Sequence, residues 1–142
     1  YPDADIPVLQ LSIDYNQAPQ YHYDLAKNLQ SLRSKGVLIM GSGNMVHNLR
    51  MVAWDKLQEP EFGYDWAIEM NTLFKEKIAN NDFKALIEYE KLGSAAKLAI
   101  PTPDHYYPLL YNIALRDDKE EVRFFNDKPV GGSLTMTSVK IG

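Results

Sequence analysis

The sequence of 142 residues contains no cysteine, so disulfides, thiolate zinc sites and cysteine nucleophiles are excluded. It also lacks an excess of basic residues. The net charge of -4 provides no electrostatic footprint for nucleic acid or for anionic lipid. Its longest apolar stretches, such as residues 37–40, are too short to span a bilayer, and no secretory signal is visible. These absences predict a cytoplasmic protein without nucleic-acid or membrane partners.

What is present is ordinary globular composition, with 45% hydrophobic and 24% charged residues. The length suits one domain with a hydrophobic core, and no internal repeat or linker divides residues 1–142. The chain begins at Tyr1 without an initiator Met and soon runs into a strand-like segment. A processed domain and a fragment could both begin in this way. We therefore expect one domain or part of one.

The first forty residues have the pattern of a strand, a helix and a second strand. Residues 6–13 are rich in branched apolar side chains, as is typical of a strand. Residues 19–34 have helical spacing and are followed by Gly36, and residues 37–40 form a short apolar run. Such a run is typical of a strand buried on both faces of a sheet. The pattern predicts a parallel βαβ unit in an α/β fold, with a central sheet flanked by helices.

The rest of the chain alternates between predicted helices and strands. Helical spacing extends over residues 64–79, 82–89 and 104–115, with Thr102 or Asp104 as the N-cap of the last helix. Residues 122–125 and 133–141 are predicted strands, although the second alternates imperfectly.

The loop after the second predicted strand contains Gly41-Ser42-Gly43. It is not a dinucleotide fingerprint, because Val46 occupies the position of the third glycine. It is not a nucleophile elbow either, because Ser42 lacks a glycine two residues away on each side, and the Lys-Ser/Thr pair of a P-loop is absent. The glycines are then explained by a close approach of the backbone to a ligand or metal, or by a plain tight turn.

The chain has three histidines, and two of them stand at predicted loop-to-helix junctions. His47 follows the glycine loop at the carboxyl end of a predicted strand, where α/β folds bind ligands. His105 lies in the first turn of a predicted helix, where the helix dipole disfavours the imidazolium. Neutral imidazole is a common metal ligand and an acid/base near neutral pH. His22 is expected to be structural.

Two histidines do not complete a mononuclear metal site, which usually has three protein ligands. Asp104 and Asp14 could supply oxygen ligands, but an N-cap and a strand-end turn explain them equally well. The residues alone do not decide whether this chain contributes to a metal site.

Four segments, in this order and across nearly the whole chain, resemble the C-terminal half of the 4,5-DOPA dioxygenase extradiol family, which belongs to the LigB-type class III extradiol dioxygenases. They are residues 1–12 (YPDADIPVLQLS), 41–50 (GSGNMVHNLR), 101–111 (PTPDHYYPLLY) and 132–139 (GSLTMTSV). The second and third are the most specific.

The resemblance implies an α/β protein with one metal ion, Fe(II) for activity or Zn(II) in some bacterial members. It implies that His47 and His105 are active-site residues, as metal ligands or as acid/base groups. The family's other metal histidines lie in an N-terminal half that this sequence does not contain. The resemblance therefore implies an incomplete half of a larger α/β domain that pairs with the missing half and is inactive in isolation.

The implied reaction is the opening of catechols such as DOPA with molecular oxygen. Asn44, Asn48 and Arg50 are candidate substrate-orienting residues, with Arg50 facing a substrate carboxylate. Hydrogen bonding within the loop explains these three residues equally well. Two alternatives stay open: a zinc-dependent hydrolase or amidase, and a truncated domain without catalytic function.

Overall fold

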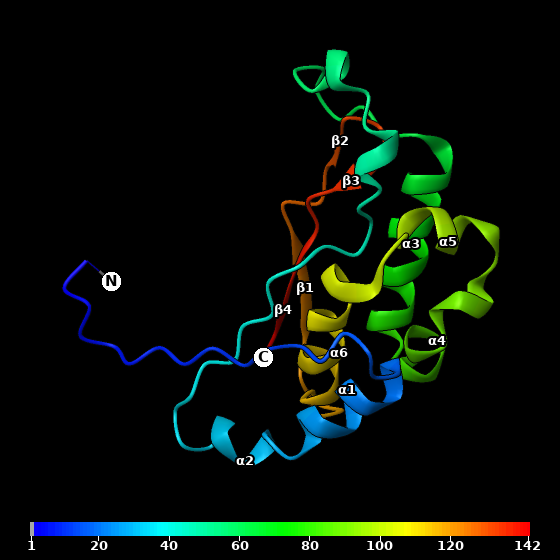
Figure 1. Cartoon of the computed structure of the whole chain (residues 1–142). Coiled ribbons are helices and arrows are strands. Elements are labelled where there is room, and N and C mark those ends of the chain that lie inside the picture. Colours follow the sequence, from blue (N-terminus) through cyan, green and yellow to red (C-terminus); the bar gives the residue numbers. More distant parts are fainter. Residues whose placement is uncertain (1) are drawn as a thin grey trace.

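The computed structural model describes residues 2–142, so Tyr1, the first residue of the resemblance, lies outside the described residues. Helices dominate, joined by four short 3-10 turns and two small sheets (Figure 1). The helices are α1 (Pro19–Lys27), α2 (Gln30–Arg33), α3 (Asp65–Ala79), α4 (Phe83–Ile87), α5 (Ser94–Ala99) and α6 (Tyr107–Ala114). The 3-10 turns are η1 (Leu49–Met51), η2 (Trp54–Lys56), η3 (Tyr89–Leu92) and η4 (Pro103–His105). The strands are β1 (Val122–Phe125), β2 (Pro129–Val130), β3 (Leu134–Thr135) and β4 (Ser138–Ile141).

The helix α3 supplies the middle of the core. Met70, Phe74 and Ile78 recur every four residues, so they share one helix face, and each is at most 1% exposed. They pack with fully buried side chains from α4 and α6, among them Leu86 and Leu110. Because burying one such side chain contributes about 1.5–3 kcal/mol, this cluster dominates the stability of the fold.

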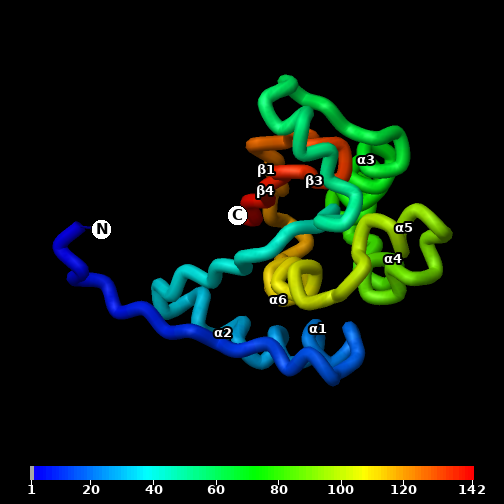
Figure 2. Tube along the Cα trace, turned by 45° about the horizontal axis from the view of Figure 1, so that its top comes forward, coloured from blue at the N-terminus to red at the C-terminus, as the bar shows by residue number. Residues whose placement is uncertain are grey.

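The helix α6 connects this core to the N-terminal part of the chain. The helix α1 packs along it, as both views of the backbone show (Figures 1 and 2). At their interface His22 is fully buried, with its ring centroid 4.2 Å from that of Tyr107 and its Nδ1 3.1 Å from the Tyr111 hydroxyl. The position of His22 agrees with the structural role expected for it.

Both sheets of the described residues are two-stranded and antiparallel, β1 with β4 and β2 with β3. In the first sheet Val122 pairs with Ile141, and its apolar side chains pack on the helical core. An isolated bridge joins His47 to Leu134 of β3. The small sheets therefore hold the loop that carries His47 against the body of the molecule.

The predicted parallel βαβ unit is not confirmed. Residues 6–13 and 37–40 are extended, but neither belongs to a sheet within the described part of the chain. The helical stretch between them is present as α1 and α2. A strand that is buried on both faces of a sheet needs neighbouring strands. Residues 2–142 supply none beside residues 37–40. The mixture of helices and strands agrees with the predicted α/β class at this coarser level.

The other predicted elements agree better with the structure. The helices α3, α4 and α6 and the strand β1 appear where the apolar spacing predicted them. The predicted strand 133–141 is divided into β3 and β4, and the last predicted helix begins with the separate turn η4. None of the helices described for residues 2–142 is long and apolar enough to cross a membrane.

Candidate active site

The segment of residues 44–48 is held by backbone hydrogen bonds from three directions. The amide of Asn44 donates to the carbonyl of His105 at 2.7 Å, and the amide of His47 donates to the carbonyl of Ala99 at 2.9 Å. The amide of Asn48 donates to the carbonyl of Ser133 at 3.2 Å. This loop is therefore fixed against the end of α5, the turn η4 and the residue before β3.

The two glycines before it make this close packing possible. A Cβ atom on Gly43 would overlap the carbonyl oxygen of His105. A Cβ atom on Gly41 would overlap Oδ1 of Asn112 and lie 2.6 Å from the carbonyl oxygen of Pro108. Neither glycine has a positive φ, so space rather than backbone conformation explains them. The glycines thus allow a close approach to the protein's own backbone and to the side chain of Asn112, whereas the predicted approach was to a ligand or metal.

As a consequence, the two histidines singled out from the sequence lie next to each other. The ring centroids of His47 and His105 are 5.1 Å apart, and the rings are tilted by 45°. His47 is buried, while the side chain of His105 is 54% exposed. The pair thus consists of one enclosed and one accessible imidazole.

Both ring nitrogens of His47 face backbone carbonyl oxygens. Nδ1 lies 2.9 Å from the carbonyl of Asn44, and Nε2 lies 2.9 Å from the carbonyl of Thr102. A neutral imidazole donates from only one nitrogen, so it cannot satisfy both carbonyls. Burial lowers the pKa of His47 and the nearby His105 acts in the same direction, while the two carbonyls oppose the shift. In these contacts His47 offers no free nitrogen to a metal.

His105 has the opposite arrangement. Its Nδ1 lies 2.9 Å from Oδ2 of Asp104, and Asp104 accepts a hydrogen bond from Thr102 that lowers the pKa of its carboxyl. A carboxylate in this position keeps the proton on Nδ1 and leaves Nε2 free as a lone-pair donor. Such carboxylate–histidine pairs are usual behind metal ligands. The geometry of His105 therefore fits a metal ligand better than that of His47.

The three candidate substrate-orienting residues differ in their surroundings. Asn48 is buried, its Nδ2 donates to the carbonyl of Leu98 at 2.9 Å, and its Oδ1 accepts from the amide of Arg50 at 3.2 Å. Oδ1 of Asn44 accepts from the amide of Val46 at 3.1 Å. Arg50 is exposed. The side chain of Asn48 is thus engaged within the loop, and Arg50 is the most accessible of the three.

The sequence interpretation missed the part played by Thr102, which was considered only as an N-cap. Its carbonyl meets His47 and its side chain bonds Asp104, so it contacts both halves of the histidine site. The only signal was its place in the segment of residues 101–111 that carries the family resemblance. Every residue type has a backbone carbonyl, so a contact made through one cannot be predicted from the residue type.

The described residues do not complete a metal site. Across residues 2–142, no group of three or more His, Asp or Glu side chains is placed to hold a metal ion. The third histidine, His22, belongs to the α1–α6 interface. The fit to one metal is therefore partial: His105 with Asp104 suits it, and further ligands would have to come from elsewhere.

Relatives of known name match the whole chain. A protein of Escherichia coli K12 named 4,5-DOPA dioxygenase extradiol is 39% identical over 147 residues, which cover 100% of this chain and 52% of that protein. A protein of the same name from Beta vulgaris is 30% identical and is matched over 99% of this chain and 51% of its own length. The match covers the C-terminal half of these relatives.

The chain belongs to the 4,5-DOPA dioxygenase extradiol family. It spans about half the length of the curated relatives it matches. A solved structure of an uncharacterized protein from E. coli K12 superposes on this 4,5-DOPA dioxygenase-like chain with a TM-score of 0.89 at 37% identity, covering 100% of this chain and 58% of that one. No family model matches the sequence. The family membership predicted from the four segments is thus confirmed.

Proposed function

We propose that this chain forms the C-terminal part of the active site of an extradiol dioxygenase that opens catechols such as DOPA with molecular oxygen. The observation that carries the proposal is the adjacency of His47 and His105, in a chain whose whole length matches dioxygenases. The relatives' names support ring cleavage at the family level. No structural feature favours the hydrolase alternative over this one.

His105 is the proposed metal ligand of this chain, through Nε2, with Asp104 as the residue that orients its ring. A bound Fe(II) or Zn(II) would supply the Lewis acidity that favours deprotonation of a catechol. The remaining ligands are proposed to come from the N-terminal half that the relatives contain. The isolated chain is therefore proposed to be inactive.

His47 is proposed as the acid/base residue of the site. Burial lowers its pKa, so the ring is neutral near neutral pH and able to accept a proton from a substrate hydroxyl. The carbonyls of Asn44 and Thr102 fix the plane of the ring. A neutral ring donates to only one of these carbonyls, so the other nitrogen would have to turn away from its carbonyl to accept the substrate proton. Metal binding by His47 would require the same release.

Arg50 is the proposed partner of a substrate carboxylate, because its guanidinium is exposed two residues beyond the fixed Asn48. Asn44 is proposed to orient the substrate beside it. Asn48 is proposed to act indirectly, by shaping the loop. With Arg50 in this role, a catechol that carries a carboxylate would bind better than catechol itself.

A cytoplasmic location for the protein is also part of the proposal.

The test uses this chain co-expressed with the N-terminal half of the E. coli relative, here called the assembled protein. It would be loaded with Fe(II) under anaerobic conditions and mixed with DOPA in an oxygen electrode. We expect oxygen uptake that matches the formation of a coloured ring-opened product and falls at least 100-fold in His47→Ala. No uptake with any catechol at full metal occupancy would contradict the proposal and favour a hydrolase.

A further inference from the structure

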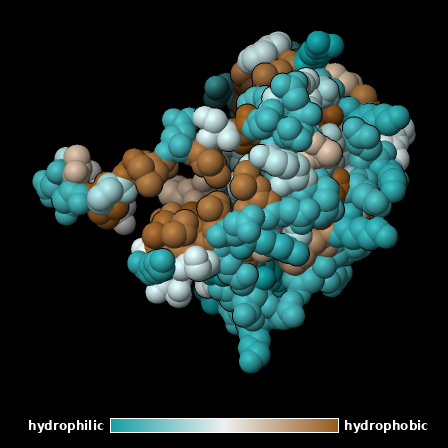
Figure 3. Space-filling view, turned by 60° about the horizontal axis from the view of Figure 1, so that its bottom comes forward, coloured by the Kyte–Doolittle hydropathy of each residue, from teal (hydrophilic) through white to brown (hydrophobic). Residues whose placement is uncertain are grey.

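Two extended segments of this molecule expose apolar side chains to solvent. The N-terminal arm, residues 6–13, leaves Val8 88% and Leu9 96% exposed, and in residues 37–40 Leu38 and Met40 are 77% and 82% exposed. Figure 3 shows apolar surface on a projecting part of the molecule and around a hollow beside it. Monomeric proteins rarely expose contiguous apolar surface of this kind without a partner.

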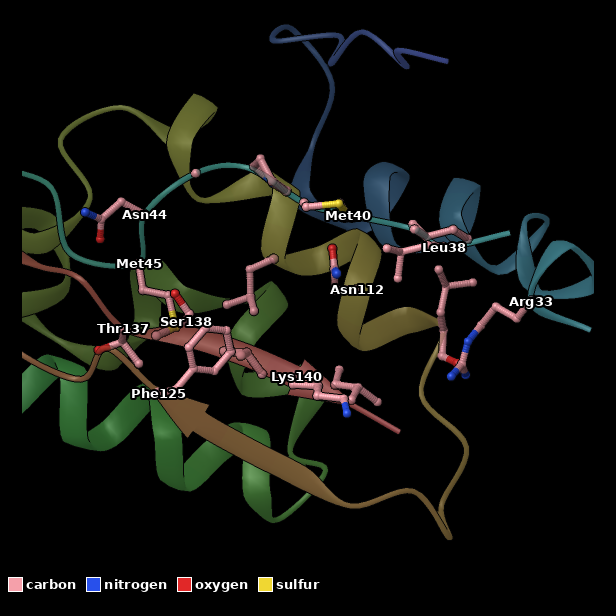
Figure 4. A pocket seen from close by; sticks show the side chains of 18 of the residues that line it. Arg33, Leu38, Met40, Asn44, Met45, Asn112, Phe125, Thr137, Ser138 and Lys140 are labelled. Carbon is pink, nitrogen blue, oxygen red and sulfur yellow. The ribbon is translucent and has the colours of Figure 1, made fainter. Parts of the chain in front are cut away.

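The hollow is a trough of about 780 Å³ between residues 36–45, the helix α6 and the strand β4. Figure 4 shows side chains of all three elements lining it, with Leu38 and Met40 on one side and Phe125 on another. Its rim at α2 is held in place, since Arg33 donates to the carbonyl of Leu115 at 2.6 Å and pairs with Glu120. The trough is therefore a preformed feature rather than a gap beside a loose loop.

The backbone and one side chain of this region lack hydrogen-bond partners. Within residues 2–142, no backbone hydrogen bond joins residues 6–13 or 38–42 to another segment. Oδ1 of Asn112, which lines the trough, is a buried acceptor without a partner in the described residues. Exposed, unpaired backbone in an extended segment can accept a neighbouring strand, as the edge of a sheet does, and the buried Oδ1 of Asn112 needs a hydrogen-bond donor.

We infer that apolar β-strands of an N-terminal half fill the trough and pair with residues 6–13 and 37–43, so that both extended segments become strands of one sheet. We identify the occupant from the length of the relatives, which contain about as much chain again as the part matched here. It follows also from the apolar, branched composition of both segments, which suits strands buried on two faces. The inference deepens the partner in the proposed function and is independent of the metal and of catechol chemistry.

The sheet so formed would connect the assembly interface to the active site. Residues 37–43 lead directly into the loop of Asn44 and His47, and Gly43 contacts the carbonyl of His105. An added strand beside residues 37–43 would therefore place the end of the N-terminal half next to the histidine pair. This is where the further metal ligands of the proposed site are needed.

The experiment compares the chain alone with the assembled protein, purified through a tag on this chain. Mass photometry or light scattering gives the stoichiometry, and hydrogen exchange gives the protection of residues 6–13 and 37–43. We expect a 1:1 complex in which amides of both segments exchange at least 100-fold more slowly than in the chain alone. Leu38→Asp should abolish co-purification.

The matched control is Trp54→Asp, because Trp54 is 67% exposed and does not line the trough. Neither substituted side chain is buried in the isolated chain, so both variants should fold alone with unchanged circular dichroism. A symmetric dimer of this chain that protects the same segments would overturn the inference in favour of a second copy. A complex in which the segments stay unprotected, or one that tolerates Leu38→Asp, would overturn it as well.

If the two halves do not co-purify, the same variants are tested in a single-chain fusion of the N-terminal half to this chain. In that fusion Leu38→Asp should lower the melting temperature far more than Trp54→Asp, and equal effects would refute the inference. Assembly without oxygen uptake would refute the proposed dioxygenase but leave this inference standing. Oxygen uptake by a complex in which the trough stays open would support the proposed dioxygenase and refute this inference.

Discussion

The helical core and the trough region differ in how completely their residues satisfy one another. The core around α3 and α6 buries its apolar faces, and the fully buried Tyr106 donates its hydroxyl to the carbonyl of Leu86 at 2.8 Å. The trough region, meaning residues 6–13 and 37–40, is also rich in apolar residues, but most of them remain exposed and without strand partners in the part of the chain described. Apolar composition alone therefore does not produce a folded element. The core finds its packing partners within residues 2–142, and in the same range the trough region finds no strand partners.

The largest contrast should come from truncating one apolar side chain in each region. Phe74→Ala should destabilise the isolated chain by about 3–5 kcal/mol, because the side chain is fully buried and would leave a cavity. Leu38→Ala should change the free energy of unfolding by less than about 0.5 kcal/mol, because Leu38 already faces solvent. Urea denaturation followed by circular dichroism measures both. Equal effects would break the comparison.

The junction between the two regions can be tested through Gly43. Gly43→Ala should destabilise the chain by about 1–3 kcal/mol, since its Cβ would meet the backbone carbonyl of His105 and the loops would have to separate. Ser42→Ala, at the exposed neighbouring position, is the control and should have almost no effect. Denaturation of the isolated chain gives the stability. An unchanged Gly43→Ala variant would show that the loop is not packed as described.

The metal proposal can be sharpened through Asp104. Asp104→Asn should weaken Fe(II) or Zn(II) binding by the assembled protein about 10–100-fold, the usual cost of losing a carboxylate behind a ligating histidine. Asp118→Asn, at an exposed position of the turn before β1, is the matched control. Competition with a chromophoric chelator measures the affinity without relying on activity. Unchanged affinity would show that Asp104 does not orient a ligating His105.

The smallest effect concerns pH and the α1–α6 interface. Burial lowers the pKa of His22, so the unfolded chain binds its proton at a higher pH than the folded chain does. Stability contributed by neutral His22 is therefore fully present above about pH 6.5, the ordinary histidine value, and is lost as the pH falls below it, by at most about 1.4 kcal/mol per pH unit. Denaturation midpoints of the chain between pH 7.5 and 5 should decline less in His22→Gln. A decline unchanged by the substitution would place the titrating group elsewhere.

How far the sequence predicted this molecule depends on where the interactions of each residue lie. The helices α3 and α6 were predictable because their apolar spacing records a buried face that the same chain covers. Residues 37–40 showed the composition of a buried strand, but composition does not say which polypeptide supplies the neighbouring strand. The parallel βαβ unit was therefore predicted from this chain alone and is not found within residues 2–142.

The candidate site shows the same division. His47 and His105 were identified separately, from their positions and from the resemblance, and the structure brings their rings together. Their different surroundings could not be predicted, because the carbonyl of Thr102 that faces His47 belongs to a segment 55 residues away and is independent of residue type. The sequence singled out the two histidines, and the backbone around them distinguishes the proposed acid/base residue from the proposed ligand.

The central claim is that this chain carries one part of a dioxygenase site that an N-terminal half completes. Its most direct test is oxygen uptake on addition of DOPA, measured for the Fe(II)-treated chain alone and for the Fe(II)-loaded assembled protein. The account predicts no uptake by the chain alone and product-matched uptake by the assembled protein. Uptake by the chain alone, or none by a metal-loaded assembled protein, would contradict it.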